Sequence, residues 1–223
     1  MTFSIVARCA KTGQFGMAIS SSSPAVAGRC AHVRAAVGAV ASQNITDPGL
    51  GPLILDQLEA GLPADKALAA VTRDRPHIDY RQLLVVDRAG RTAIHSGRQV
   101  LGIWGEARAT DCAAGGNLLA GELVPMTMVE AFTTAKGPLG ERLMLALEAG
   151  LEAGGEAGPV HSAGLKVADR LGWPLVDLRI DWAEDPIGML RQAWEVYAPQ
   201  MAAYVQRAED PTQAPKYGVP GDA

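Results

Sequence analysis

The chain has 223 residues, of which 48% are apolar and 20% are charged, and its formal net charge is -4. This length fits one large or two small domains with a sizeable core. Acidic and basic residues are interspersed, and no apolar run approaches the ~20 residues that cross a bilayer. We therefore expect a cytoplasmic protein without a nucleic-acid or membrane partner.

The first part of the chain has the pattern of strands. Residues 2–9 alternate apolar and small side chains, residues 10–14 carry a glycine turn, and residues 15–22 continue as a second strand. Residues 34–43 are rich in small and β-branched side chains, which predicts a third strand buried on both faces.

The elements that follow alternate between helices and strands. Leucines and isoleucines at helical spacing predict two helices over residues 51–74, and residues 80–97 form a second hairpin. A short strand is expected near residues 110–116, two amphipathic helices over 122–135 and 138–153, and strands over 161–169 and 174–181. A last helix over 185–210 is expected to kink near Pro199.

Hairpins rather than βαβ crossovers dominate this order, so the sheets should be mainly antiparallel with helical pairs covering them. The expected fold is α+β, a four-layer αββα sandwich with two mainly antiparallel sheets. No break in composition divides the chain, which predicts a single domain over residues 1–223, in which residues 207–223 form a Pro- and Gly-rich tail.

The chain has no phosphate-binding, dinucleotide-binding or nucleophile-elbow motif, and its histidines lack metal-ligand spacing. Its cysteines, Cys9, Cys30 and Cys112, are odd in number and widely spaced, which favours buried thiols over disulfides or zinc ligands. We expect no cofactor and no metal.

Small polar residues stand at the ends of several predicted strands. They are Thr2, Ser4, the run Ser20 to Ser23, the triplet Ser42, Gln43 and Asn44, and Asn117 after Gly115 and Gly116. Strand ends converge on one rim in antiparallel layers, so these residues could line one cleft, although each is also an ordinary turn residue. Arg34, before the third strand, could be a surface cation or point inward.

These features resemble the N-terminal-nucleophile (Ntn) hydrolases, whose fold is the αββα sandwich. The stretches MTFSIVARC, VGAVASQ, GNLLAGE and VDLRIDW are more specifically similar to a bacterial family of unknown function, domain-of-unknown-function family 1028, which is grouped with that superfamily. The similarity runs from Met1 to about Tyr197.

The resemblance implies roles for individual residues. Thr2 falls where the superfamily has its nucleophile, and Arg34 falls near its lysine. Ser20 falls where proteasome-like members have an aspartate that holds this lysine. The residue that would hold the Arg34 cation is therefore a neutral serine here. Gly116 and Asn117 match the region that helps to form the oxyanion hole.

An Ntn-type mechanism would use Thr2 after Met1 is removed, with its α-amine as the base. Arg34 would stabilise negative charge, and Asn117 with backbone N–H groups near Gly116 would receive the oxyanion. Ser4, Ser20, Ser22, Gln43 and Gly116 would contact a small amide, peptide or N-acyl substrate.

Two other functions remain open: a non-catalytic protein that binds a metabolite or serves assembly, and a thiol enzyme. Apolar and aromatic residues near the C-terminus, Trp194, Tyr197, Met201 and Tyr204, favour a homo-oligomer such as a dimer, or else packing within the chain.

Overall fold

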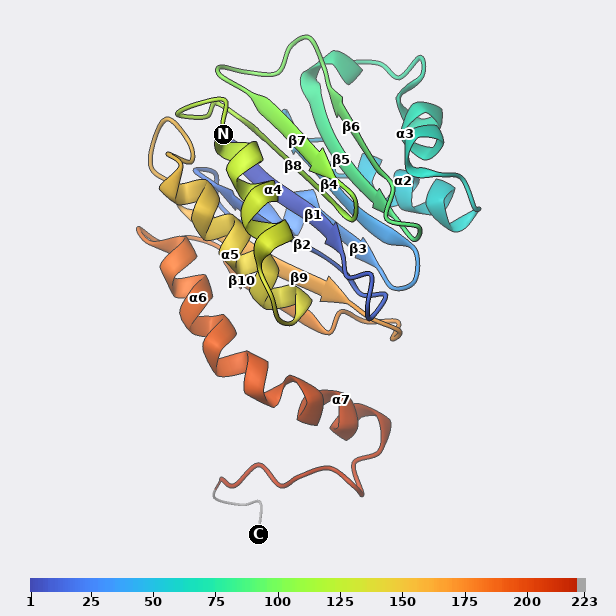
Figure 1. Cartoon of the computed structure of the whole chain (residues 1–223), viewed down its shortest axis with the longest axis vertical. Coiled ribbons are helices and arrows are strands. Elements are labelled where there is room, and N and C mark those ends of the chain that lie inside the picture. The colour runs from blue at the N-terminus through green and yellow to red at the C-terminus, as the bar shows by residue number, and fades with distance from the viewer. Residues whose placement is uncertain (220–223) are drawn as a thin grey trace.

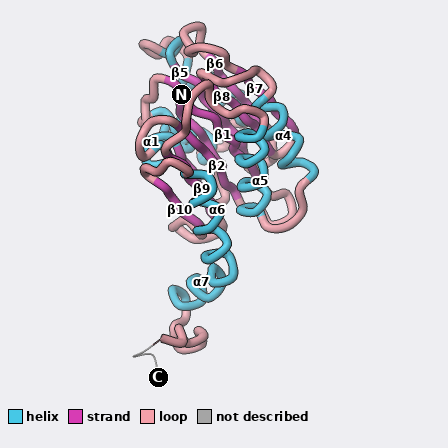
Figure 2. The backbone as a smooth tube through the Cα atoms, turned by 90° about the vertical axis from the view of Figure 1, so that its left-hand side faces the viewer, coloured by secondary structure: helices cyan, strands magenta, loops and turns pink. Residues whose placement is uncertain are grey.

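Two antiparallel sheets lie face to face in the computed structural model, which describes residues 1–219 (Figure 1). Helices cover the outer face of each sheet, which gives the layer order helix, sheet, sheet, helix (Figure 2). The predicted four-layer αββα sandwich with antiparallel sheets is confirmed.

The larger sheet has six strands in the order β10-β9-β2-β1-β8-β7. Their bounds are β1 Thr2–Arg8, β2 Phe15–Ser21, β7 Gly105–Ala109, β8 Cys112–Asn117, β9 Ser162–Ala168 and β10 Val176–Ile180. The hairpin at the N-terminus occupies the middle of this sheet, because β1 pairs with β2 on one side and with β8 on the other.

The smaller sheet has four strands in the order β3-β4-β5-β6. Their bounds are β3 Ala31–Arg34, β4 Gly38–Asn44, β5 Arg81–Asp87 and β6 Thr92–Ser96. Strands β4 and β5 face β1 and β8 of the larger sheet across the interior.

Helices α4 (Val124–Thr134), α5 (Leu139–Glu152) and α6 (Pro186–Tyr197) pack on the larger sheet, and α2 (Leu50–Glu59) and α3 (Ala64–Thr72) pack on the smaller one. A short helix, α1 (Val26–Cys30), joins the two sheets between β2 and β3. Among the described residues, no helix is long and apolar enough to cross a membrane.

Alternation along the strands separates the two faces of each sheet. Phe3, Ile5 and Ala7 on β1 pack under the helices, whereas Val6 lies in the core between the sheets. By the same alternation Thr2 and Ser4 face the gap between the sheets. The apolar core between the sheets therefore gives way to polar side chains where β1 begins.

Three local features differ from the prediction. The expected third strand over 34–43 starts only at Gly38, as β4, because Ala36 takes a left-handed conformation (φ 59°) and turns the chain, and the preceding strand β3 was not predicted. Helix α1 was not predicted, since five residues are too few for a helical period. Strand β7 was also missed, because its alternation is carried by Gly and Ala rather than by large apolar residues.

The C-terminal helix breaks where the sequence predicts. Helix α6 ends at Tyr197, a 3₁₀ turn spans Ala198–Gln200 and includes Pro199, and α7 continues over Met201–Glu209 (Figure 1). Helix α7 covers the first residues of the predicted tail at 207–223, and residues 220–223 lie outside the described residues. Trp194 is buried and packs on Gly140 of α5. Some of the apolar and aromatic residues near the C-terminus therefore pack within the chain.

Candidate active site

Strand β1 begins at Thr2, and the hydroxyl of Thr2 meets the carbonyl of the residue before it. Thr2 is 5% exposed, and its Oγ1 donates a hydrogen bond to the carbonyl oxygen of Met1. Ser21 pairs with Thr2 across the hairpin in the register that sets Phe3 opposite Ser20. The Ser21 hydroxyl donates to the same Met1 oxygen, so two hydroxyls from neighbouring strands hold one carbonyl.

The Ser21 hydroxyl is oriented by the chain that follows it. The backbone N–H of Ser23 donates to Ser21 Oγ at 3.1 Å, and the Ser23 hydroxyl lies 2.9 Å from the same atom. Thr2 Oγ1 is 3.3 Å from Ser21 Oγ. Because the Ser23 N–H occupies an acceptor position on Ser21 Oγ, the Ser21 proton is directed toward the Met1 carbonyl.

A fully buried network of polar side chains lies beneath Thr2, between the two sheets. Ser4 Oγ donates to Gln43 Oε1 at 2.6 Å, and Gln43 Nε2 donates to Gln82 Oε1 at 2.9 Å and to the Gly115 carbonyl at 3.1 Å. Buried polar groups of this kind are stable only when they are hydrogen-bonded, and here each amide fixes the orientation of the next.

Asn117 ends this network with an unused acceptor. Gln82 Nε2 donates to the carbonyls of Gly105 and Gly116, which fixes Gln82 Oε1 toward Asn117, and Asn117 Nδ2 donates to it at 3.3 Å. Among the described residues, this orientation leaves Asn117 Oδ1 buried without a hydrogen-bond partner. Asn117 pairs with Thr2 across β1 and β8, so the free acceptor lies on the residue opposite Thr2.

One buried carboxylate, Glu156, lies beside this group. It is 5% exposed, and both of its oxygens accept from the backbone N–H of Ser22, at 3.1 and 3.2 Å. Burial raises the pKa of Glu156 to about 7, whereas the nearby α-ammonium of Met1 and the Ser22 hydrogen bonds act to lower it. The loop that carries Glu156 is tied to the rim, because Ala157 N–H donates to the Leu118 carbonyl.

One residue expected at the site, Arg34, lies elsewhere. Arg34 is at the opposite end of β4 from Gln43, since it pairs with Gly38, and its guanidinium bonds Asp56 and Glu59 of α2. The structure therefore does not bring Arg34 to Thr2, and the role expected for it there is not supported.

Other expected contacts change their form. The Ser20 hydroxyl turns away from Thr2 and donates to the Ser162 carbonyl at 3.0 Å. Ser22 contributes its backbone N–H rather than its side chain. Gly116 is paired on both sides, with Phe3 and with Gly105, so the sheet ladder takes its N–H and it is not free to receive an oxyanion. In Asn117, the unpaired group is the acceptor and not the expected donor.

Sequence reasoning missed Gln82 and Glu156, and it included Ser21 only as a member of the run Ser20 to Ser23. The signal for Ser21 was present, because Phe15, Met17 and Ile19 mark one face of β2 and Ser21 continues that alternation. Glu156 lies in a glycine-rich loop that gave no signal.

The three cysteines are buried, as predicted. Burial raises the pKa of Cys112 to about 11 and raises that of Cys30, which opposes thiolate formation. Burial acts to raise the pKa of Cys9, but hydrogen bonds from Thr12 and Lys11 and the charge of Arg142 together lower it. Cys9 follows the far end of β1 from Thr2. No cluster of three metal-ligating side chains occurs within residues 1–219.

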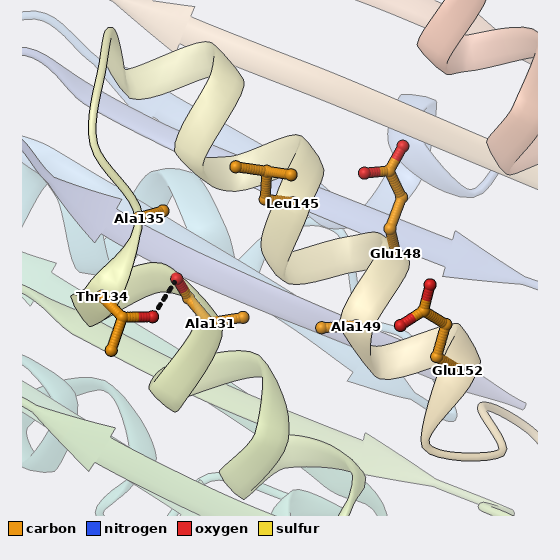
Figure 3. Close-up of a pocket in the computed structure, with 7 residues that line it drawn as sticks. All are labelled: Ala131, Thr134, Ala135, Leu145, Glu148, Ala149 and Glu152. Carbon is orange, nitrogen blue, oxygen red and sulfur yellow. Dashed lines mark hydrogen bonds between the residues drawn. The ribbon is translucent and has the colours of Figure 1, made fainter.

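A shallow groove of about 360 Å³ lies on the outer helical layer between α4 and α5 (Figure 3). Its lining residues are Ala131, Thr134, Ala135, Leu145, Glu148, Ala149 and Glu152. Glu148 is engaged by Arg191, and the Thr134 hydroxyl bonds its own helix. The groove lies outside the larger sheet, whereas Thr2 faces its inner side.

Comparison with known proteins gives a family and several similar structures. The model of a family described as "Family of unknown function (DUF1028)" matches residues 2–190. The crystal structure of protein SPO2555 from Silicibacter pomeroyi, assigned to the same family model, is 31% identical, covers 92% of this chain and 90% of its own, and superposes with a TM-score of 0.85. The comparison with curated proteins found no match.

Two further structures are more distant. Anbu (ancestral beta-subunit) from Yersinia bercovieri is 11% identical over 91% of this chain and 97% of its own, with a TM-score of 0.40. An Anbu Gly-1 mutant from Hyphomicrobium sp. strain MC1 is 10% identical over 98% and 100% of the two chains, with a TM-score of 0.43.

Proposed function

The chain belongs to the DUF1028 family of unknown function, and from the geometry at its N-terminus we propose that it is an amidohydrolase whose nucleophile is Thr2, once the Met1–Thr2 peptide bond is broken. Its substrates are small amides, peptides or N-acyl compounds. The observation that carries this proposal is the Met1 carbonyl, whose oxygen accepts from both Thr2 Oγ1 and Ser21 Oγ.

The reaction needs a base for the Thr2 hydroxyl, and the freed α-amine of Thr2 supplies it. An α-amine has an ordinary pKa of ~8, so a useful fraction is neutral at physiological pH without help from a cation. The unpaired Asn117 Oδ1 on the opposite strand offers an acceptor for one N–H of this amine. Asn117 is thus a positioning residue for the base in this proposal.

The reaction then proceeds through an ester on Thr2. The amine takes the proton from Thr2 Oγ1, and Oγ1 attacks the substrate carbonyl to give a tetrahedral oxyanion, to which the Ser21 hydroxyl donates. The ammonium returns the proton to the departing amine, the C–N bond breaks, and the acyl group remains as an ester on Thr2. Water, deprotonated by the same amine, hydrolyses the ester and restores the hydroxyl.

The test starts from protein whose N-terminal residue is Thr2, verified by intact mass, and measures hydrolysis of a panel of aminoacyl and N-acyl anilides. Thr2→Val keeps the shape of the side chain without its hydroxyl and should abolish turnover, while Thr2→Ser should retain it. Thr92→Val, the same change on the edge strand β6, is the matched control and should leave turnover unchanged.

Ser21→Ala measures the oxyanion contribution. Loss of one such donor costs about 3–4 kcal/mol of transition-state stabilisation, so kcat should fall by roughly a hundredfold or more. Equal turnover by wild type and Thr2→Val would refute the proposal, as would Met1 retained on every molecule purified from the native host. The second result would favour the non-catalytic role instead.

A further inference from the structure

The position of Met1 indicates which acyl groups the proposed site would accept. In the structure Met1 is an acyl group attached to the nitrogen of Thr2, and its carbonyl oxygen already lies between the two hydroxyls of Thr2 and Ser21. An acyl group moves from the nitrogen to Oγ1 of one threonine through a five-membered ring, so it occupies nearly the same space in both forms. Met1 therefore stands in for the acyl half of a substrate on Thr2.

The α-ammonium of Met1 acts electrostatically on a buried carboxylate, that of Glu156. Glu156 is buried, and Ser22 N–H is its hydrogen-bond donor among the described residues. Ser22 directly follows Ser21, which holds the Met1 carbonyl, so Glu156 and the carbonyl-binding hydroxyl are fixed by adjacent residues of one chain segment. A buried carboxylate with so few donors is costly unless a cation joins it, and the Met1 ammonium acts on it electrostatically.

The Met1 side chain also has a defined neighbour. A Cβ added at Gly158 would lie 3.5 Å from Met1 Cε, which is van der Waals contact. The loop from Glu156 to Gly158 therefore lies beside the Met1 side chain, and it carries the carboxylate on which the Met1 ammonium acts. Removal of Met1 would leave a space bounded by a carboxylate, two hydroxyls and a glycine.

We propose that the site takes amides and peptides whose acyl half is an α-amino acid with a free ammonium group, which Glu156 binds while Thr2 and Ser21 receive the carbonyl. This proposal rests on the proposed function, because it assigns the substrate class of the Thr2 reaction. Under it the protein removes one residue from a free amino terminus, and Gly158 leaves room for an unbranched side chain as long as that of methionine.

The experiment compares L-methionine p-nitroanilide with N-acetyl-L-methionine p-nitroanilide on protein that begins at Thr2. Hydrogen bonds to charged groups contribute enough that kcat/KM should be about tenfold to a hundredfold higher for the free amine. Glu156→Gln keeps an acceptor for Ser22 and should reduce that ratio about tenfold or more. Glu152→Gln, an exposed glutamate at the end of α5, is the matched control and should keep the ratio of wild type.

A second measurement separates this proposal from the Thr2 chemistry. Calorimetry with L-methioninamide and N-acetyl-L-methioninamide on Thr2→Val protein freed of Met1 reports binding without turnover, and only the free amine should bind in a Glu156-dependent way. If Thr2-dependent hydrolysis is as fast for the acetylated anilide as for the free-amine anilide, the substrate class is wrong and the proposed function still holds. Amine-dependent binding without hydrolysis would overturn the proposed function and support the Glu156 site. If neither hydrolysis nor amine-dependent binding occurs, both proposals are wrong.

Discussion

Glu156→Gln should change the pH dependence of stability in protein that retains Met1. Burial raises the pKa of Glu156 from 4.5 to about 7, so the folded protein keeps a proton that the unfolded chain has already released. The contribution of Glu156 to the free energy of unfolding is therefore fully present below pH 4.5 and is lost as the pH rises through about 7. At ~1.4 kcal/mol for each pH unit of that interval, the loss amounts to about 3 kcal/mol.

Urea unfolding of wild type, Glu156→Gln and Glu152→Gln at pH values from below 4.5 to about 8 measures this contribution. Gln carries no charge, so the difference in unfolding free energy between wild type and Glu156→Gln should shift by about 3 kcal/mol across the interval, with the variant gaining relative stability as the pH rises. Glu152→Gln should follow wild type at every pH. Parallel profiles for wild type and Glu156→Gln would show that Glu156 keeps its ordinary pKa and would refute the reasoning.

Four further predictions concern the fold. Gly140→Ala places a Cβ 2.5 Å from the buried ring of Trp194 and should lower the free energy of unfolding by about 1–2 kcal/mol, measured by urea denaturation. The control Gly121→Ala meets nothing within 4 Å and should change the free energy of unfolding by less than about 0.5 kcal/mol. Gln82→Leu removes the centre of the buried amide network and should cost about 2–4 kcal/mol in the same assay. Arg34→Ala breaks only solvent-exposed ion pairs, so a loss above about 1 kcal/mol, or any change in amide turnover, would contradict its placement away from Thr2. The homodimer expected from the sequence stays a prediction, and a monomeric mass by light scattering would rule it out.

The sequence predicted most of the fold because the pattern that defines each long element is local. Alternation over residues 2–8 and leucines at helical spacing over 139–152 follow from burying one face of a strand or helix, and both elements form where expected. Strand β4 was predicted within residues 34–43, but its hairpin with β3 was missed, because the turn depends on a left-handed conformation of Ala36 that an alanine in the sequence does not indicate.

The candidate site was predictable only in part. Thr2, Ser4, Gln43 and Asn117 do meet at one end of the sandwich, because antiparallel strands bring their ends to a common rim. The run of four serines, by contrast, required the register with β1 before Ser21 rather than Ser20 could be assigned to Thr2.

Local sequence patterns were enough to predict the alternating strand that begins at Thr2, the amphipathic helices and the small polar residues at the strand ends, since each depends on neighbours along the chain. The three-dimensional fold was needed to show that Arg34 lies at the far end of β4 and that the carboxylate of Glu156 is buried where the Met1 ammonium acts on it. The placement of Glu156 depends on a pairing between residues more than a hundred positions apart, Ser22 and Glu156, for which a local pattern carries no information.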